Sequence, residues 1–148
     1  LAKAAILASF IPIVMSTAGN AGIQASTVAV QGLATGTLTF ADLGWRLVKE
    51  LSGALVNGLI AAGVLFMLVM VMAQLDVGVE APLRLATTAA LAEMIVVIAA
   101  VAVGATVPIV LDRIGIDPAM ATGVFITTGN DILAILVFFL MVTLIYFV

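Results

Sequence analysis

Four long apolar segments make up nearly the whole of this chain and constrain its fold more than any other feature. Each exceeds the roughly 20 residues that a helix needs to cross the hydrocarbon core of a bilayer. A backbone in lipid must bond its own polar groups, and the strict two-residue alternation of a barrel strand is absent, so these segments must be helices. The sequence therefore predicts an all-α polytopic membrane helix bundle, a single transmembrane domain over residues 1–148, with helices at Ala4 to Leu38, Leu47 to Leu75, Pro82 to Leu111 and Pro118 to Val148.

The composition supports a membrane protein and excludes several classes of function. Of the 148 residues, 65% are hydrophobic and 9% are charged, whereas soluble domains average about 45–50% apolar and 25% charged residues. Cysteine and histidine are absent, which removes disulfides, thiolate or imidazole metal sites and histidine-based catalysis. A net charge of −3 without any basic run predicts no nucleic-acid partner. No nucleophile and base pair is recognisable, so the chain is not expected to be an enzyme.

The few basic residues predict how the helices are oriented. Arg46, Lys49 and Arg113 fall on one side of the membrane, and Lys3 and Arg84 fall on the other. The positive-inside rule then places the connections 39–46 and 112–117 in the cytoplasm. The connection on the other side, at 75–81, carries two acidic residues, Asp76 and Glu80. This orientation puts Leu1 outside, so we expect a further helix before it in the complete polypeptide.

Asp131 lies near the middle of the last apolar segment, and a carboxylate at that depth costs about 2.5–3.5 kcal/mol to insert. Thr127 and Thr128 precede it by four and three residues, which places both hydroxyls on its side of a helix. Carboxylate and hydroxyl oxygens suit a hard cation such as Mg2+ or Ca2+. The alternative is an ion pair, although Lys and Arg occur only near the segment ends.

The first segment carries a stripe of polar residues at spacings of three and four, which one helical face would present together: Thr17, Asn20, Gln24, Thr27 and Gln31. These groups either bond to neighbouring helices or line a path that contains water. Within the stripe, Gly19 and Gly22 allow close helix packing or the exposure of backbone carbonyls to a cavity.

Two further acidic residues have more than one interpretation. Glu93, about a third of the way into the third segment, could serve a second cation or a proton step. It could equally reach toward the membrane surface or bond Thr or Asn groups of a neighbouring helix. Asp117, followed by Pro118, is typical of a helix N-cap and could additionally gather divalent cations at a cytoplasmic mouth.

Several strings resemble the membrane domain of MgtE-type magnesium transporters, in order and in spacing: Pro12-Ile13-Val14-Met15-Ser16-Thr17-Ala18-Gly19-Asn20-Ala21-Gly22-Ile23-Gln24, Leu33-Ala34-Thr35-Gly36, Gly115-Ile116-Asp117-Pro118-Ala119 and Thr128-Gly129-Asn130-Asp131. The resemblance implies a five-helix domain in the plasma (inner) membrane, forming a homodimer with a Mg2+ pore on its two-fold axis. The four segments here then correspond to the second to fifth helices, so the first helix is missing from this chain.

The resemblance also implies roles for particular residues. The family's pore carboxylate lies fourteen positions beyond the Asp of its Asp-Pro-Ala motif, and Asp131 stands in that relation to Asp117. Gly19, Asn20 and Gly22 match the family's Gly-Asn-x-Gly motif, which implies that they face the pore. The sequence departs from the usual family pattern at Ala18, at Ile23 and at 122–124, which leaves fine selectivity undetermined.

Together these observations predict a channel or transporter for Mg2+, with the transported ion near six residues: Asp131, Asn20, Gly19, Thr127, Thr128 and Gln24. The expected partners are a second copy of the chain, the lipid bilayer and divalent cations. Two alternatives remain open at this point. One is a proton- or sodium-coupled exchanger in which Asp131 and Glu93 alternate, and the other is a membrane scaffold that transports nothing.

Overall fold

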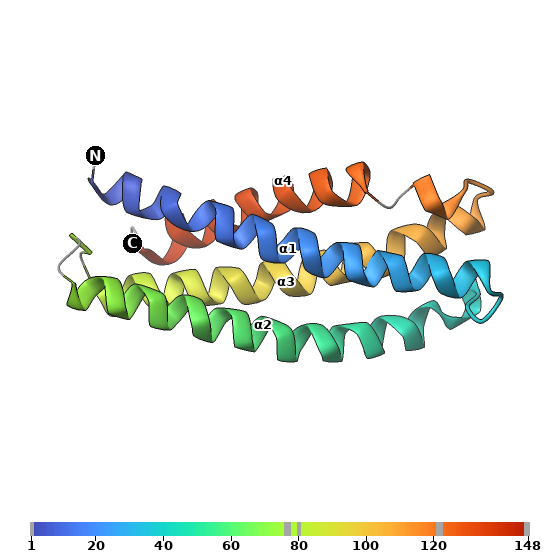
Figure 1. The fold of residues 1–148 in the computed structure, drawn as a ribbon, viewed down its shortest axis with the longest axis horizontal. Helices are drawn as coiled ribbons and strands as arrows, with labels where there is room; N and C mark the ends of the chain where they lie inside the picture. Colours follow the sequence, from blue (N-terminus) through green and yellow to red (C-terminus); the bar gives the residue numbers. More distant parts are fainter. Residues whose placement is uncertain (1, 76–77, 80, 121–122, 147–148) are drawn as a thin grey trace.

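The computed structural model describes residues 2–75, 78–79, 81–120 and 123–146 of the chain, with side chains from Ile6 onward (Figure 1). Asp76, Glu80, Thr122 and Val148, which the sequence places in connections or at a segment end, lie outside these ranges.

The described residues form a bundle of long helices and contain no strand. Among the described residues, four helices are long and apolar enough to cross a membrane, which confirms the predicted all-α membrane fold. The elements are α1 Ala2–Ala34, the 3-10 turn η1 Phe40–Asp42, α2 Leu43–Gln74, α3 Pro82–Arg113, the 3-10 turn η2 Pro118–Met120, α4 Val124–Met141 and the π-helical turn η3 Val142–Tyr146.

The helix ends differ from the predicted ones where local hydrogen bonds form turns. The backbone N–H and the hydroxyl of Thr39 both donate to Asp42 Oδ2, at 2.9 and 2.7 Å, and so fix η1 ahead of α2. Asp117 does act as a cap, since its Oδ1 accepts the N–H of Ala119 at 2.9 Å. It caps η2, however, and not the spanning helix. α4 begins only at Val124, because Gly123 has φ 85° and cannot continue a helix.

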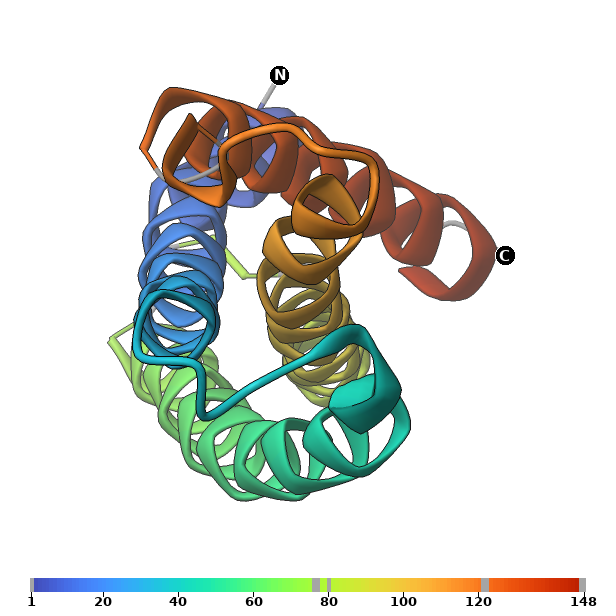
Figure 2. The same cartoon turned by 90° about the vertical axis from the view of Figure 1, so that its right-hand side faces the viewer.

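α3 is the central helix and packs against α1, α2 and α4, whereas α1 and α2 barely touch (Figure 2). α1 and α3 run in one direction, and α2 and α4 run in the other (Figure 1). Small buried residues allow this packing. A Cβ added to Gly104 of α3 would clash with the carbonyl oxygen of Gly22 in α1, so the two backbones meet directly.

The connections at one end of the bundle are held by contacts between elements. The Arg113 guanidinium at the end of α3 lies over the Phe40 ring of η1, 5.5 Å from its centroid, a favourable cation–π distance. The outer face of α2 is apolar and exposed, for example at Ile60, Val64 and Met67. An unbroken apolar face of this kind suits contact with lipid.

Candidate functional site

The predicted site residues of the first and last helices meet in one groove. This groove has a volume of about 480 Å3 and lies between α1 and α4. Its walls are Pro12, Met15, Ser16, Gly19, Asn20 and Ile23 from α1 and Thr127 and Asp131 from α4. Four of the six predicted residues, Asp131, Asn20, Gly19 and Thr127, therefore lie together. The i, i+4 spacing of Thr127 and Asp131 places both on one face of α4, as the sequence predicts.

Asp131 presents its carboxylate to this groove. The side chain is partly exposed and makes no hydrogen bond or ion pair with any other residue that the structure describes. Gly19 faces it across the groove, since a Cβ added there would lie 3.8 Å from Asp131 Oδ1. No basic residue within the described ranges therefore pairs with Asp131, as the ion-pair interpretation would require. The carboxylate is free to interact with water or with a ligand.

The other two predicted residues lie elsewhere. Thr128 is exposed and is not part of the groove wall. Gln24 lines a second pocket, of about 420 Å3, between α1 and α2, where Glu50, Gly53 and Asn57 of α2 also lie. The polar stripe of α1 is the reason for this separation. Asn20 and Gln24 are neighbouring members of the stripe, yet Asn20 borders the groove with α4 and Gln24 borders the pocket with α2.

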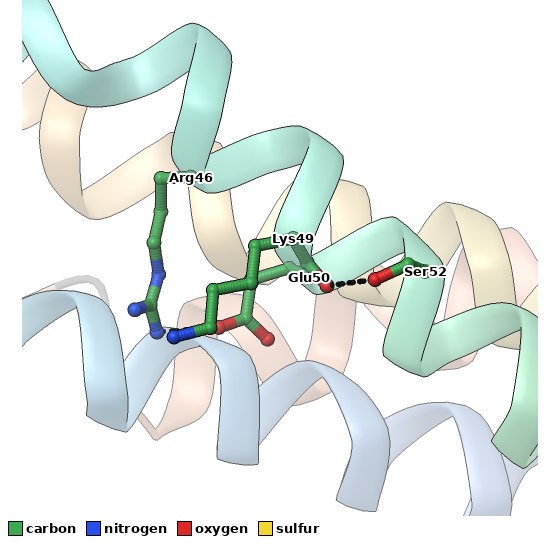
Figure 3. Close-up of polar contacts among 4 residues, drawn as sticks. All are labelled: Arg46, Lys49, Glu50 and Ser52. Carbon is green, nitrogen blue, oxygen red and sulfur yellow. Dashed lines mark hydrogen bonds and ion pairs between the residues drawn. The ribbon is translucent and has the colours of Figure 1, made fainter.

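The second pocket adjoins a charged cluster at the start of α2 (Figure 3). Arg46 and Glu50 form an ion pair one helical turn apart, and the Ser52 hydroxyl donates to the Lys49 carbonyl oxygen at 2.7 Å. Such a surface pair contributes only about 0.3–0.5 kcal/mol to stability. Because Glu50 already has a cationic partner, its carboxylate is less available to a metal ion than that of Asp131.

Asn130 is a polar residue that the sequence places next to Asp131 but that was not predicted to have a role of its own. It is completely buried, and both side-chain polar atoms lack a partner among the described residues. Its amide nitrogen occupies the space beside Gly22, where a Cβ would also come within 3.2 Å of the Ala100 carbonyl oxygen. Asn130 therefore points from α4 into the junction of α1 and α3, on the side away from the groove. Its place in an apolar run next to an acidic residue is the signal that could have drawn attention to it.

Glu93 is the second deep carboxyl group, and it lies outside the groove. It is 1% exposed, in the interior of α3, so the structure does not support an extended side chain that reaches the membrane surface. The Thr17 side chain of α1 faces it, but neither carboxyl oxygen has a hydrogen-bond partner within the described part of the chain.

No group of three or more acidic, cysteine or histidine residues is placed to hold a metal ion, within the ranges that the structure covers. A single carboxylate surrounded by hydroxyl and amide groups cannot replace the hydration shell of a divalent cation. It can attract such an ion and bond to its water molecules, which is how Mg2+ is commonly bound, because Mg2+ gives up water reluctantly.

Comparison with known proteins gives one consistent family. The family model MgtE, described as divalent cation transporter, matches residues 11–141. Among curated proteins, the magnesium transporter MgtE of Enterococcus faecalis is 35% identical over 140 residues, which are 94% of this chain. The magnesium transporter MgtE of Thermus thermophilus is 31% identical over 134 residues, 89% of this chain. The protein of the same name from Bacillus subtilis is 29% identical over 139 residues, 94% of this chain.

The matched region is a minor part of these relatives. The aligned residues cover 29%, 28% and 29% of the Enterococcus, Thermus and Bacillus proteins, respectively. This chain thus spans less than a third of the length of the curated relatives that it matches.

Proposed function

Because the chain belongs to the MgtE family of divalent cation transporters, we propose that it moves hydrated Mg2+ across the membrane through a pore between two copies of itself. The family and the four spanning helices make it an integral multi-pass membrane protein. In this proposal residues 1–148 act as one ion-conducting domain, and Mg2+ is the transported ion.

The groove between α1 and α4 is the observation that carries the proposal. It is open on the surface of the protomer and contains the Asp131 carboxylate, which has no ion-pair partner among the described residues. Hydrocarbon cannot cover such a surface without a cost of several kcal/mol. A second copy related by a two-fold axis would place the same groove opposite, enclosing a polar path with one Asp131 on each side. Two facing carboxylates repel each other unless a cation lies between them, which favours a doubly charged ion.

The groove residues have complementary roles in this mechanism. Asp131 supplies the negative charge that attracts the ion. Asn20 and Thr127 offer amide and hydroxyl groups that exchange hydrogen bonds with the water molecules of the hydrated ion. Gly19 has no side chain and so leaves room for that hydration shell opposite Asp131. The membrane potential supplies the driving force, about 2.3 kcal/mol per elementary charge for each 100 mV.

Uptake of Mg2+ into proteoliposomes tests this function. We expect Asp131→Asn to reduce the flux at least about tenfold while the protein stays folded, because a charged site in a low-dielectric channel loses its attraction with its charge. Thr128→Val is the matched control, since Thr128 lies one turn from Asp131 but is not part of the groove wall. It should retain the wild-type flux.

A second variant tests the width of the groove and not its charge. Gly19→Leu would place a branched side chain against Asp131 and should block conduction without changing net charge. Wild-type flux in both Asp131→Asn and Gly19→Leu would refute the proposed pathway.

The exchanger alternative is less well supported by the geometry. Its two carboxyl groups do not share a cavity, since Asp131 lines the groove between α1 and α4 and Glu93 is buried outside it. Uptake that responds to an imposed proton or sodium gradient would favour the exchanger, and absence of flux from the purified protein would favour a scaffold.

A further inference from the structure

Glu93 is a buried acidic residue for which the proposed pore has no use. It is 1% exposed, and both carboxyl oxygens lack a hydrogen-bond partner in the described ranges. An ionised carboxylate in such a place would lose its hydration without compensation. The group must therefore be neutralised by a basic residue, by a metal ion or by a proton.

A basic residue does not reach Glu93 in the part of the chain that the structure describes. Gly58 of α2 lies opposite Met94, next to Glu93, and Glu50 is about 12 Å further along that helix at 1.5 Å per residue. Lys49 and Arg46 are more distant still. The Arg84 Nε, near the start of α3, donates to the Ile145 carbonyl oxygen at 2.8 Å. The remaining charged or titratable groups on α3 and on the elements packed against it are Lys3, Asp42, Asp112, Arg113, Asp131 and Tyr146.

A metal ion is not favoured either. Glu93 does not belong to any group of three or more acidic, cysteine or histidine residues within the described ranges. Asp131 lines the groove between α1 and α4, and Glu93 is not among the residues that line it.

The hydrogen bonds of the Thr17 hydroxyl bear on whether it can pair with a protonated or with an ionised Glu93. The Thr17 hydroxyl has one proton, and its oxygen lies 3.1 and 3.0 Å from the Ile13 and Val14 carbonyl oxygens, either of which can accept that proton. With the proton on one of these acceptors, the lone pairs of the hydroxyl oxygen are left for Glu93. An ionised carboxylate would have to compete with both carbonyl oxygens for the single proton. A protonated carboxyl has an O–H and can donate it to Thr17.

We propose that Glu93 is a proton-binding site inside the protomer, a carboxylic acid that keeps its proton at neutral pH, with the Thr17 hydroxyl oxygen as the acceptor. The inference does not depend on Mg2+ conduction, since it rests on the seam between α1 and α3 alone. The proton makes the seam between α1 and α3 electrically neutral, so that Asp131 in the neighbouring groove is the charged carboxyl group of the two.

Infrared spectroscopy of the protein in lipid nanodiscs tests the protonation state directly. At pH 7 we expect a C=O stretching band of a protonated carboxylic acid in the wild type and loss of that band in Glu93→Gln. Glu50→Gln is the control, because Glu50 is paired with Arg46. It should lose a carboxylate band and retain the acid band. Loss of a carboxylate band in Glu93→Gln, or a Glu93 band that responds to Mg2+, would overturn the proposal.

A wild-type measurement protects the test against a variant that fails to fold. The chain has three glutamates, Glu50, Glu80 and Glu93, so labelling their carboxyl groups with 13C should shift a protonated acid band at pH 7. The absence of any shifted acid band would contradict the proposal without any substitution.

Thermal unfolding gives an independent readout. Glu93→Gln keeps the shape and the donor of a neutral acid, so its Tm should match the wild type below the ordinary glutamate pKa of about 4.3, where Glu93 is protonated in both the folded and the unfolded chain. As the pH is raised toward 7, Glu93 ionises in the unfolded wild type but keeps its proton in the folded protein, so the wild type should lose stability relative to Glu93→Gln. An equal loss in both proteins would count against a proton on Glu93.

Discussion

At the centre of this bundle the helices pack so closely that one added Cβ atom would not fit, as Gly22 shows. A Cβ at Gly22 would clash with the Asn130 amide nitrogen and come within 3.2 Å of the Ala100 carbonyl oxygen. Three helices thus meet at a position where only hydrogen fits. The sequence indicates that Gly22 has a packing or pore role, but it does not identify Asn130 as the neighbour, because that contact joins residues more than 100 positions apart.

Substitution of Gly22 should therefore be destabilising. We expect Gly22→Ala to cost about 1–3 kcal/mol of unfolding free energy, the usual range for overpacking a tight core. Gly63→Ala is the control, since Gly63 in α2 has no atom within 4 Å of the added Cβ. It should be neutral or stabilising by up to about 1 kcal/mol. Thermal unfolding in detergent or nanodiscs gives both values.

A double-mutant cycle identifies the responsible contact. If the clash with Asn130 dominates, Gly22→Ala combined with Asn130→Ala should be more stable than the sum of the two single effects predicts. Recovery should be incomplete, because the contact with the Ala100 carbonyl oxygen remains. Simple additivity would show that Asn130 is not the obstacle.

Residue spacing predicted the candidate site only in part. The structure places Thr127 and Asp131 of α4 in one groove with Gly19 and Asn20 of α1. Gln24 was assigned to the same site because it belongs to the same polar stripe. A stripe on one helix does not specify its neighbours, and here α4 borders Asn20 while α2 borders Gln24.

At the scale of elements, apolar length was enough to predict four spanning helices, and their ends were the uncertain part. The final segment illustrates the reason. Proline after Asp117 is typical of a helix start, yet the structure has a 3-10 turn there, followed by Gly123 at φ 85° and ψ −122°. The apolar character of Met120 to Val124 carries no information about this break, which depends on backbone conformation.

The break makes Gly123 a sensitive position. Its backbone conformation is accessible essentially to glycine alone, so Gly123→Ala should cost about 1–3 kcal/mol through strain and should shift the start of α4. Gly44→Ala is the matched control, because Gly44 lies at the start of α2 without a positive φ and without close neighbours. Equal unfolding temperatures for the two variants would contradict a strained conformation at Gly123.

At the scale of the whole molecule, one face of the protomer combines an acidic groove with an exposed polar stripe, while the opposite face of α2 is apolar. A membrane protein with this division of surfaces has one side for lipid and one side for polar contact. The sequence predicts both surfaces from the distribution of polar residues, but only the packing of α1 beside α4 shows that the polar surface is concave.

Cysteine cross-linking tests whether two copies meet at that face. The chain has no cysteine, so a single introduced thiol reports on one position. We expect Thr127→Cys to yield a covalent dimer in membranes with a short bifunctional thiol reagent, because the groove would face its copy. Val64→Cys, on the exposed apolar face of α2, should remain monomeric under the same conditions. Dimers from Val64→Cys but not from Thr127→Cys would place the contact on the wrong face for the proposed pore.

The direct backbone contact of Gly22 with Gly104 has a mechanical consequence. It joins α1, which forms one wall of the groove, directly to α3 without intervening side chains. α4 forms the other wall and is connected to α3 through a 3-10 turn and a glycine in a conformation that few residues can adopt. Any change in the width of the groove therefore requires α4 to shift relative to α1 and α3, and such a shift has to disturb the buried contact between Asn130 and Gly22.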